Sequence, residues 1–336
     1  MDKSFGPCSP IERDICPYDH VSISIGTYGQ KDGEKKLGER RPSIMNDTPK
    51  HAQVIAVGNQ KGGVGKTSNT LHLAAALGEQ GKKILVIDLD GNCGATRGCG
   101  LGTDWLGTFE ALMGQDPEEL IVGSDPVEGT ELPENVELLP ARRNLESFEE
   151  EFRRTNKFRE PSATLTPVLD RLRHRYDFIF LDTAPNASAP TVASYLSADW
   201  FILSTEPAKL SVEGLTDALM DIQSVREQGN AGLRLLGVVM CKVRTGTRVA
   251  EIFTEKIRKE FQAAGELGAF RTTISMATAI ESAQYDGKTL FQTEPSHKVA
   301  DQYRALAQEI LGRLETARAA SEAEPKPDTV TEASNA

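Results

Sequence analysis

A glycine-rich segment, Lys61–Thr67, constrains the fold of this chain more than any other feature. It reads Lys-Gly-Gly-Val-Gly-Lys-Thr, follows the short apolar run Val54–Val57 and precedes a helix-like run that begins near Ser68. A strand, a glycine loop and a helix in this order are typical of a phosphate-binding loop. Glycines let backbone N–H groups close around phosphate oxygens, and the helix N-terminus adds partial positive charge. The segment therefore predicts an α/β fold built around a phosphate site.

The loop departs from the common pattern G-x-x-x-x-G-K-[ST] at its first position. Gln60 stands where the first glycine belongs, and a second lysine, Lys61, stands at the loop entrance. The other positions match, so Lys66 can reach the β- and γ-phosphates and the Thr67 hydroxyl can bind Mg²⁺. Such a turn can also be only a tight connection, but Gly-Lys-Thr after a strand favours a nucleotide. The residues expected to contact it here are Lys61, Gly62, Gly63, Val64, Gly65, Lys66, Thr67 and Ser68.

Short apolar runs alternate with helix-like segments from Gln53 onward. The predicted strands are Val54–Val57, Ile84–Ile87, Val136–Leu139, Phe178–Leu181, Trp200–Ser204 and Leu235–Met240. The predicted helices are Thr67–Gln80, Leu145–Phe152, Ala163–Arg175, Val212–Gln228, Thr247–Ala264 and about His297–Ala320. Continuous apolar runs are typical of strands buried on both faces of a parallel sheet. The fold class is therefore α/β, a doubly wound, mostly parallel sheet flanked by helices, with ligands at the carboxyl ends of the strands.

Two of the predicted strands end in carboxylates. Asp88 and Asp90 follow Ile84–Ile87, and Asp182 follows Phe178–Leu181. Taken alone, the first two can be solvated acids at a strand end, and Asp182 can cap a following helix. Phosphoryl transfer requires Mg²⁺ on the phosphates, carboxylates that hold the metal or its waters, and a group that orients the attacking water. Together with the loop, these acids indicate one shared phosphate site.

Composition indicates the organisation of the remaining chain. Residues 1–50 are rich in Pro, Gly and charge, and 321–336 are acidic and polar, so both are predicted to be disordered around a folded domain at 51–320. No apolar run reaches membrane-spanning length and no signal peptide is evident, which predicts a soluble, cytoplasmic protein. The net charge of −11 argues against a generally basic nucleic-acid binder, although a local basic face stays possible.

Several further segments, read together with the loop, resemble the ParA/MinD group of deviant-Walker ATPases, and within it the ParA (Soj-type) partition proteins. The resemblance extends over roughly residues 53–314 and depends on the order and spacing of its motifs. Apart from Lys61–Thr67, the matching segments are Leu138–Ala141, Tyr176–Asp182, Ser211–Leu215, Phe270–Ile274 and Tyr303–Glu309.

The resemblance implies a role for each matching residue. Lys61 resembles the lysine that reaches across an ATP-bound dimer to the partner's phosphates, and Lys66 and Thr67 would bind phosphate and Mg²⁺. Asp90 resembles the acid that positions the hydrolytic water. Catalysis is thus expected from Lys61, Lys66 and Asp90, the metal site from Thr67, Asp88 and Asp182, and the adenine contacts from Met240, Lys242, Glu206 and Pro207.

As a whole, the resemblance implies an ATP- and Mg²⁺-dependent ATPase that forms a homodimer on ATP binding. Such a protein binds non-specific DNA, associates with the nucleoid in its ATP-bound form, and works with a ParB-like centromere-binding protein in plasmid or chromosome partition. The alternative is a nucleotide-switched scaffold, MinD-like or otherwise ParA-like, that positions a protein or membrane cargo. The acidic tail argues against a membrane-binding C-terminal helix.

The chain departs from the family's pattern in two places. The family usually has Pro-Gln-Gly-Asn after its two aspartates, whereas this chain has Gly91–Gly94 (Gly-Asn-Cys-Gly). Relatives carry arginines just after the strand that resembles Thr272–Ile274, but Ser275–Ile280 has none, which should weaken DNA binding. The remaining candidates for a DNA surface, each of which can also be an ordinary solvated charge, are Lys242, Arg244, Arg248, Lys256, Arg258, Lys259 and Arg271.

Scattered cysteines leave two metal hypotheses open. The spacing of Cys93 and Cys99 does not match that of a sulfur-ligated cluster between subunits. Cys8, Cys16 and His20 can bind zinc only with a fourth ligand that the sequence does not supply. Free thiols in a reducing compartment are the simpler interpretation.

Overall fold

The structure is a computed structural model that describes residues 51–123, 131–156, 159–207, 209–263 and 268–323. The described residues belong to one compact unit. The arm predicted at 1–50, with the zinc candidates Cys8, Cys16 and His20, lies outside them, as do residues 324–336 of the predicted tail. Within the described residues, none of the helices combines the length and apolar character that crossing a bilayer requires.

A parallel sheet of seven strands forms the centre of the fold. The strands are β1 (Gln53–Gly58), β2 (Ile84–Leu89), β3 (Val136–Leu139), β4 (Phe178–Thr183), β5 (Trp200–Thr205), β6 (Arg234–Val243) and β7 (Ala269–Ser275). Their order across the sheet is β3-β2-β4-β1-β5-β6-β7, and all neighbours pair in parallel. Strands β2, β3 and β4 lie on one side of β1, and β5, β6 and β7 lie on the other side. The predicted doubly wound α/β class is therefore confirmed.

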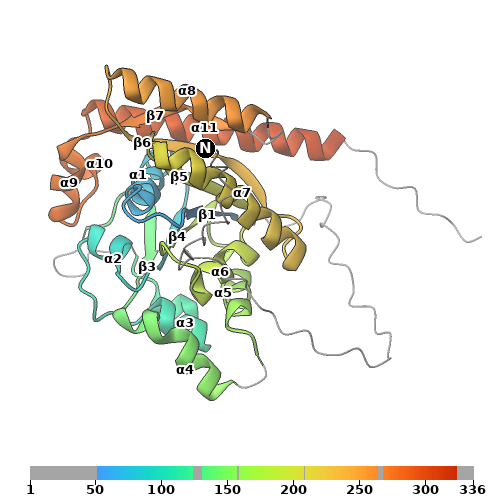
Figure 1. Cartoon of the computed structure of the whole chain (residues 1–336). Helices are drawn as coiled ribbons and strands as arrows, with labels where there is room; N and C mark the ends of the chain where they lie inside the picture. The colour runs from blue at the N-terminus through green and yellow to red at the C-terminus, as the bar shows by residue number, and fades with distance from the viewer. Residues whose placement is uncertain (1–50, 124–130, 157–158, 208, 264–267, 324–336) are drawn as a thin grey trace, which may run out of the picture. The chain divides into compact units, whose positions relative to one another are not determined.

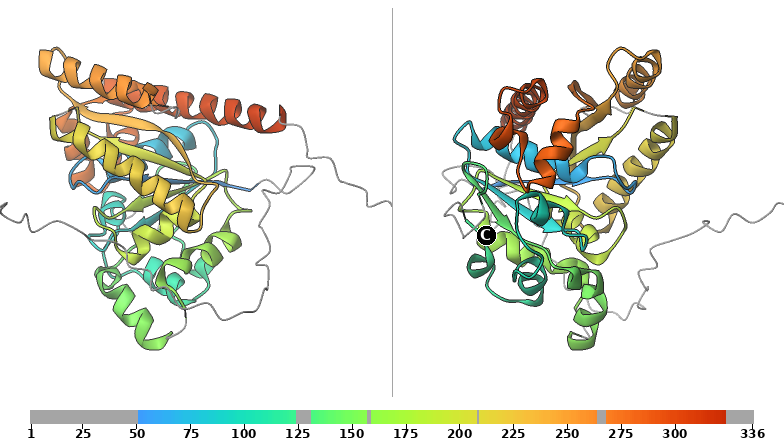
Figure 2. Two further views of the ribbon diagram at one scale, coloured as in Figure 1. Left: turned by 45° about the vertical axis from the view of Figure 1, so that its right-hand side comes forward. Right: turned by 90° about the vertical axis from the view of Figure 1, so that its left-hand side faces the viewer.

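Helices cover both faces of this sheet (Figure 1). One face is packed by α3 (Thr108–Met113), α4 (Phe148–Thr155), α5 (Leu165–Leu172), α6 (Ala189–Ser197), α7 (Lys209–Gln228) and α8 (Arg248–Ala263). The other is packed by α1 (Lys66–Gly78), α2 (Gly94–Gly98), α9 (Thr278–Tyr285), α10 (Leu290–Thr293) and α11 (Lys298–Ala323). Figure 2 shows that α11 lies beside α1, so the C-terminal helix packs against the helix that follows the glycine loop.

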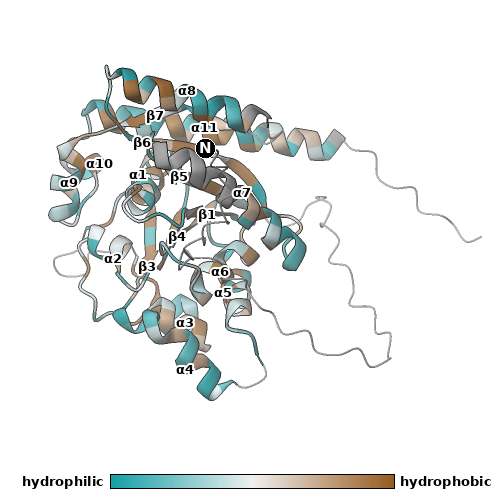
Figure 3. Cartoon of the chain, in the orientation of Figure 1, coloured by the Kyte–Doolittle hydropathy of each residue, from teal (hydrophilic) through white to brown (hydrophobic). Residues whose placement is uncertain are grey.

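The burial of the strands explains their composition. Every residue of β2, β4 and β5 is buried, as expected for central strands covered on both faces. Figure 3 shows apolar residues along the interior strands and mostly hydrophilic residues along α4. The carboxyl ends of these central strands lie at one edge of the sheet, and that edge positions the site.

Most predicted elements form where their apolar patterns place them. All six predicted strands lie within β1 to β6, and the six predicted helices correspond to α1, α4, α5, α7, α8 and α11. The pattern missed β7, an edge strand in which Arg271 is exposed, and the short helices α2, α3, α6, α9 and α10. Short helices are held by tertiary packing, so their sequences carry a weak periodic signal.

Candidate phosphate and nucleotide site

Two glycines give the loop its shape. Gly63 and Gly65 have φ angles of +75° and +80°, a conformation that residues with a side chain rarely adopt. A Cβ atom at Gly65 would also lie 2.9 Å from the Sγ atom of Cys241. Helix α1 begins directly afterwards at Lys66, so its free N–H groups and its dipole face the loop. Lys61 to Thr67 thus form a cradle suited to phosphate oxygens.

The two aspartates predicted for the metal site meet Thr67 at the sheet edge. Parallel pairing places Asp182 of β4 beside Asp88 of β2 and beside Val57 of β1. The Thr67 hydroxyl donates to Asp182 Oδ2 at 2.8 Å, and Asp88 Oδ2 accepts from the Thr96 backbone N–H at 2.8 Å and from its hydroxyl at 2.7 Å. Both carboxylates are fully buried.

Burial raises the pKa of both carboxyl groups, and repulsion from a neighbouring carboxylate adds to each shift. For Asp182 the larger cause is loss of solvent and the next is the charge of Asp88; for Asp88 burial dominates, against hydrogen bonds from Thr96. A cation would relieve this repulsion. Among the described residues no group of three or more acidic, His or Cys side chains forms a cage. A hydroxyl and two carboxylates fit Mg²⁺, which uses few protein ligands and takes the rest from water and phosphate.

The two lysines of the loop lie in different environments. Lys66 is buried, and its Nζ donates to the Lys61 carbonyl at 3.4 Å. Burial lowers the pKa of Lys66, while the charges of Asp182 and Asp90 oppose that shift. Lys61 is exposed, and its backbone N–H donates to Asn59 Oδ1 at 2.8 Å. Lys66 is therefore directed into the site of this chain, whereas the Lys61 side chain is exposed to solvent outside it.

Asp90 lies in the loop that follows β2. Its Oδ1 accepts from the backbone N–H of Asn92 at 2.9 Å and from the Asn92 side chain at 3.1 Å. The backbone of Cys93 closes the turn with φ of +54°, a strained value for a residue with a side chain. Arg97 of α2 donates to the Asn92 carbonyl. Asp90 is thus held at the rim of the site, half-buried, while Asp88 lies beneath it.

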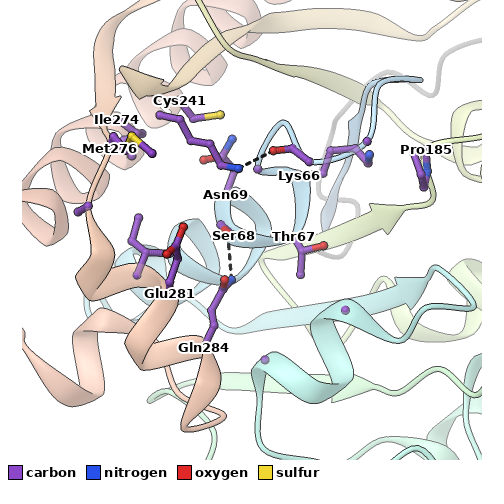
Figure 4. Close-up of a pocket in the computed structure, with 18 of the residues that line it drawn as sticks. Lys66, Thr67, Ser68, Asn69, Pro185, Cys241, Ile274, Met276, Glu281 and Gln284 are labelled. Carbon is purple, nitrogen blue, oxygen red and sulfur yellow. Dashed lines mark hydrogen bonds between the residues drawn. The ribbon is translucent and has the colours of Figure 1, made fainter. Parts of the chain in front are cut away.

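A cleft of about 540 Å³ joins these elements. It extends from Gly62 and Lys66 past Asp90 to the residues after β7, and Figure 4 shows Thr67 and Pro185 on one side and Ile274 and Met276 on the other. Gln284 of α9 crosses its floor and donates to the Ser68 hydroxyl at 2.9 Å. Its volume lies in the range of small-molecule sites, and its lining combines polar groups at the loop with apolar ones near β7.

The residues predicted for adenine separate in the structure. Lys242 lines the cleft, and its Nζ donates to the Gly63 carbonyl at 2.7 Å and lies 3.7 Å from Glu206 Oε1. Met240 is fully buried in the core on the α7 and α8 side and does not line the cleft. Pro207 and Glu206 are half-buried beyond β5 and do not line the cleft either. Cys241, between Met240 and Lys242, lines the cleft instead.

The basic candidates for a DNA surface occur mainly on α8 and β7. Arg244 and Arg248 are exposed, and the Arg258 guanidinium donates to the Arg271 carbonyl at 3.0 Å. Neighbouring acids offset part of this charge: Lys259 pairs with Glu255, Lys256 pairs with Glu260, and Arg271 lies 4.0 Å from Glu309. Lys242 instead donates to the Gly63 carbonyl of the glycine loop.

Sequence patterns missed several residues of the site. Behind the loop, Asn69 donates to the Ser204 hydroxyl and accepts from Tyr303, and Ser204 in turn donates to the Val64 carbonyl. Arg97 and Gln284 line the cleft as well. Only Tyr303 carried a signal, because it opens one of the segments that resemble the ParA branch. The others are brought to the site by the fold and not by local spacing.

The fold and the loop define a P-loop nucleotide-binding protein of the deviant-Walker type. Residues 52–235 match the family described as AAA domain. The chain is 32% identical to the chromosome-partitioning ATPase Soj of Thermus thermophilus over 264 residues, which are 78% of this chain and 97% of that protein. The chain belongs to the ParA/Soj-type ATPases.

Solved structures share the fold. Cobyrinic acid a,c-diamide synthase of Mycobacterium smegmatis, with a bound ATP analogue and magnesium, has a TM-score of 0.64 and 25% identity, and the match covers 80% of this chain and 97% of that one. The septum site-determining protein MinD of Pyrococcus horikoshii, complexed with Mg-ADP, has a TM-score of 0.60 and 22% identity, and covers 77% and 96%. The second likeness supports the fold alone.

Proposed function

We propose that the chain is a Mg²⁺-dependent ATPase that dimerises on binding ATP. In this proposal the dimer binds DNA without sequence preference, and a ParB-like partner stimulates hydrolysis during plasmid or chromosome partition. The observation that carries the proposal is that the two lysines of the loop lie in different environments. Lys66 and Thr67 face the buried carboxylates, whereas Lys61 is exposed at the loop entrance. A site of this kind needs a second copy to bring Lys61 to the phosphates.

The residues of the chain have separate tasks in this mechanism. The loop N–H groups and Lys66 bind the β- and γ-phosphates, and Thr67 and Asp182, with Asp88 beneath, would hold Mg²⁺. When bound, Mg²⁺ supplies charge neutralisation between the phosphates. Asp90 orients the attacking water from the rim, and Lys61 of the partner subunit offsets negative charge on the transferring group. Most of the catalytic effect is therefore positioning and charge stabilisation.

A second candidate function is a nucleotide-switched scaffold that positions a protein or membrane cargo. The observation that favours it is the segment after β7, where Met276 is exposed and Ser275–Ile280 contains no arginine or lysine. The acidic residues that pair with the lysines of α8 also favour this function, because they offset the positive charge that DNA binding needs. Against it stands the 32% identity to a protein whose name is chromosome-partitioning ATPase, over nearly its whole length.

Binding to non-specific duplex DNA across a salt series separates the two functions. With ATP and Mg²⁺ we expect ATP hydrolysis and DNA binding whose log affinity falls linearly with log salt, because phosphate contacts release counterions. ADP serves as the control and should support little binding.

Arg244→Ala combined with Arg248→Ala should reduce both the affinity for DNA and the slope of its salt dependence. Hydrolysis without DNA binding at about 50 mM salt would favour the scaffold, and absence of hydrolysis under all conditions would contradict the ATPase itself.

A further inference from the structure

We propose that Arg97 is a positioning residue for ATP hydrolysis, which acts through Asn92 on Asp90. The inference rests on the proposed ATPase function and assigns a task to a residue outside the glycine loop. Arg97 lies on α2, lines the same cleft as Asp90 and is exposed to solvent. Among the described residues, no carboxylate forms an ion pair with it.

A short chain of hydrogen bonds connects Arg97 to Asp90. The guanidinium donates to the Asn92 carbonyl. The backbone N–H and the side-chain amide of Asn92 both donate to Asp90 Oδ1, at 2.9 and 3.1 Å. The Cys93 N–H donates to the Asp90 carbonyl at 2.7 Å. The position of the Asp90 carboxylate therefore depends on Asn92, and the position of Asn92 depends on Arg97.

Packing explains why this loop needs a tether. The residue after the second aspartate is Gly91, which is buried, and a Cβ atom there would lie 2.4 Å from Cγ and 3.1 Å from the backbone nitrogen of Glu146. A proline, which would restrict the backbone at this position, does not fit against Glu146. Glycine leaves the loop with more backbone freedom. Arg97 compensates by fixing the next residue from α2.

An arginine suits this task for electrostatic reasons. Its guanidinium presents several donors in a fixed plane, so one N–H can hold the Asn92 carbonyl while others remain available. A hydrogen bond from a charged donor is also stronger than one between neutral groups. The charged donor therefore suits Asn92, which is the exposed residue of this loop.

Kinetics of Arg97→Met and Arg97→Lys test the inference. Arg97→Met retains the length of the side chain but cannot donate, so we expect kcat to fall about tenfold or more while the affinity for ADP changes little, because a small misplacement of a catalytic group is costly. Arg97→Lys can still donate once and should recover part of the rate. Arg318→Met, an exposed arginine of α11 that pairs with Glu322 outside the cleft, is the matched control and should keep its full rate.

A double variant shows whether Arg97 works through Asp90. In Asp90→Ala, adding Arg97→Met should cause no further loss of kcat, since the group that it positions is gone. Additive losses, or an unchanged kcat in Arg97→Met with a normal melting temperature, would overturn the inference. Either result leaves the ATPase proposal intact as long as the unmodified chain hydrolyses ATP. A fall in ADP affinity equal to the fall in kcat would instead assign Arg97 to nucleotide binding and also contradict the inference.

Discussion

Gly65 is the loop position at which the structure leaves least room for a side chain. Its φ of +80° is strained for any other residue, and a Cβ would meet Cys241 Sγ at 2.9 Å. We expect Gly65→Ala to lower the free energy of unfolding by about 2 kcal/mol, through backbone strain and overpacking together. Urea unfolding of the nucleotide-free chain measures this directly.

Gly62 provides the matched control for that substitution. A Cβ there meets nothing within 4 Å, and its φ is not among the positive values of the chain. Gly62→Ala should therefore leave the free energy of unfolding within about 0.5 kcal/mol of the original value. Combining Gly65→Ala with Cys241→Ala removes the close contact but not the strain. A Gly65→Ala chain as stable as Gly62→Ala would show that the loop relaxes freely.

Residues with a local pattern were predictable from the sequence, and residues without one were not. Lys66 and Thr67 follow from the glycine spacing, and the structure places Asp182 within 2.8 Å of Thr67, as expected for strands that end at one edge. Arg97 has no such pattern, because its importance lies in one contact with a loop carbonyl. Met240 was expected near adenine, but the alternation of side chains along β6 directs it into the core and its neighbour Cys241 into the cleft.

His72 joins helix α1 to the C-terminal elements. Its Nδ1 donates to the Ser68 carbonyl at 2.7 Å, its Nε2 accepts from the Leu290 N–H at 3.2 Å, and its ring stacks on Tyr303. Both nitrogens are used by the neutral ring, so a second proton would break the bond to Leu290. Burial lowers the pKa of His72 to about 4, below the value of about 6.5 in an unfolded chain.

This shift predicts a stability that depends on pH. Between about pH 4 and pH 6.5 the unfolded chain binds a proton that folded His72 does not, so the contribution of His72 to the free energy of unfolding is lost as pH decreases through that window, by about 3 kcal/mol in total. The raised pKa values of Asp88 and Asp182 contribute slopes of the opposite sign, so the effect of His72 is the difference between the original chain and His72→Gln. Urea unfolding of both chains across this range measures that difference, and the free energy of unfolding of His72→Gln should lose about 3 kcal/mol less than that of the original chain as pH decreases. His174→Asn, at an exposed histidine, is the control and should preserve the slope. The same slope in His72→Gln would assign the effect to other groups.

Elements buried on both faces were the easiest to predict. The continuous apolar runs of β2, β4 and β5 identify central strands, because each of their residues is buried. The apolar pattern missed strand β7, where only the resemblance placed a strand, at Thr272–Ile274. The strand lies at the edge of the sheet and alternates buried Phe270 with exposed Arg271 over only part of its length. Helix α10 contacts α1 and α11, as in the hydrogen bond from the Leu290 N–H to His72, and α9 contacts α2 and α10. Such tertiary contacts leave no periodic pattern in the local sequence.

At the scale of the whole molecule, the topology brings the residues of the site together at one edge of the sheet. The side chain of Lys61 in the glycine loop lies outside this cluster. Strand β4 pairs in parallel with β1 on one side and β2 on the other, so the carboxyl ends of these three strands lie together. Lys66 enters that cluster and is buried by it, whereas Lys61 remains exposed. The proposed dimer gives Lys61 a counterpart in the phosphates of the partner subunit.

Replacing Lys61 tests this proposal on the assembled protein. We expect Lys61→Ala to lose ATP-dependent dimerisation in size-exclusion chromatography with light scattering, and to lose most ATP hydrolysis, because charge on the transferring phosphoryl group is no longer offset from the partner subunit. ADP affinity should change little, since Lys66 and the loop N–H groups remain. Lys83→Ala, an exposed lysine before β2 and therefore at the opposite end of that strand, is the control for net charge. A Lys61→Ala chain that still dimerises with ATP would mean that the exposed lysine serves another purpose and that the site is complete within one chain.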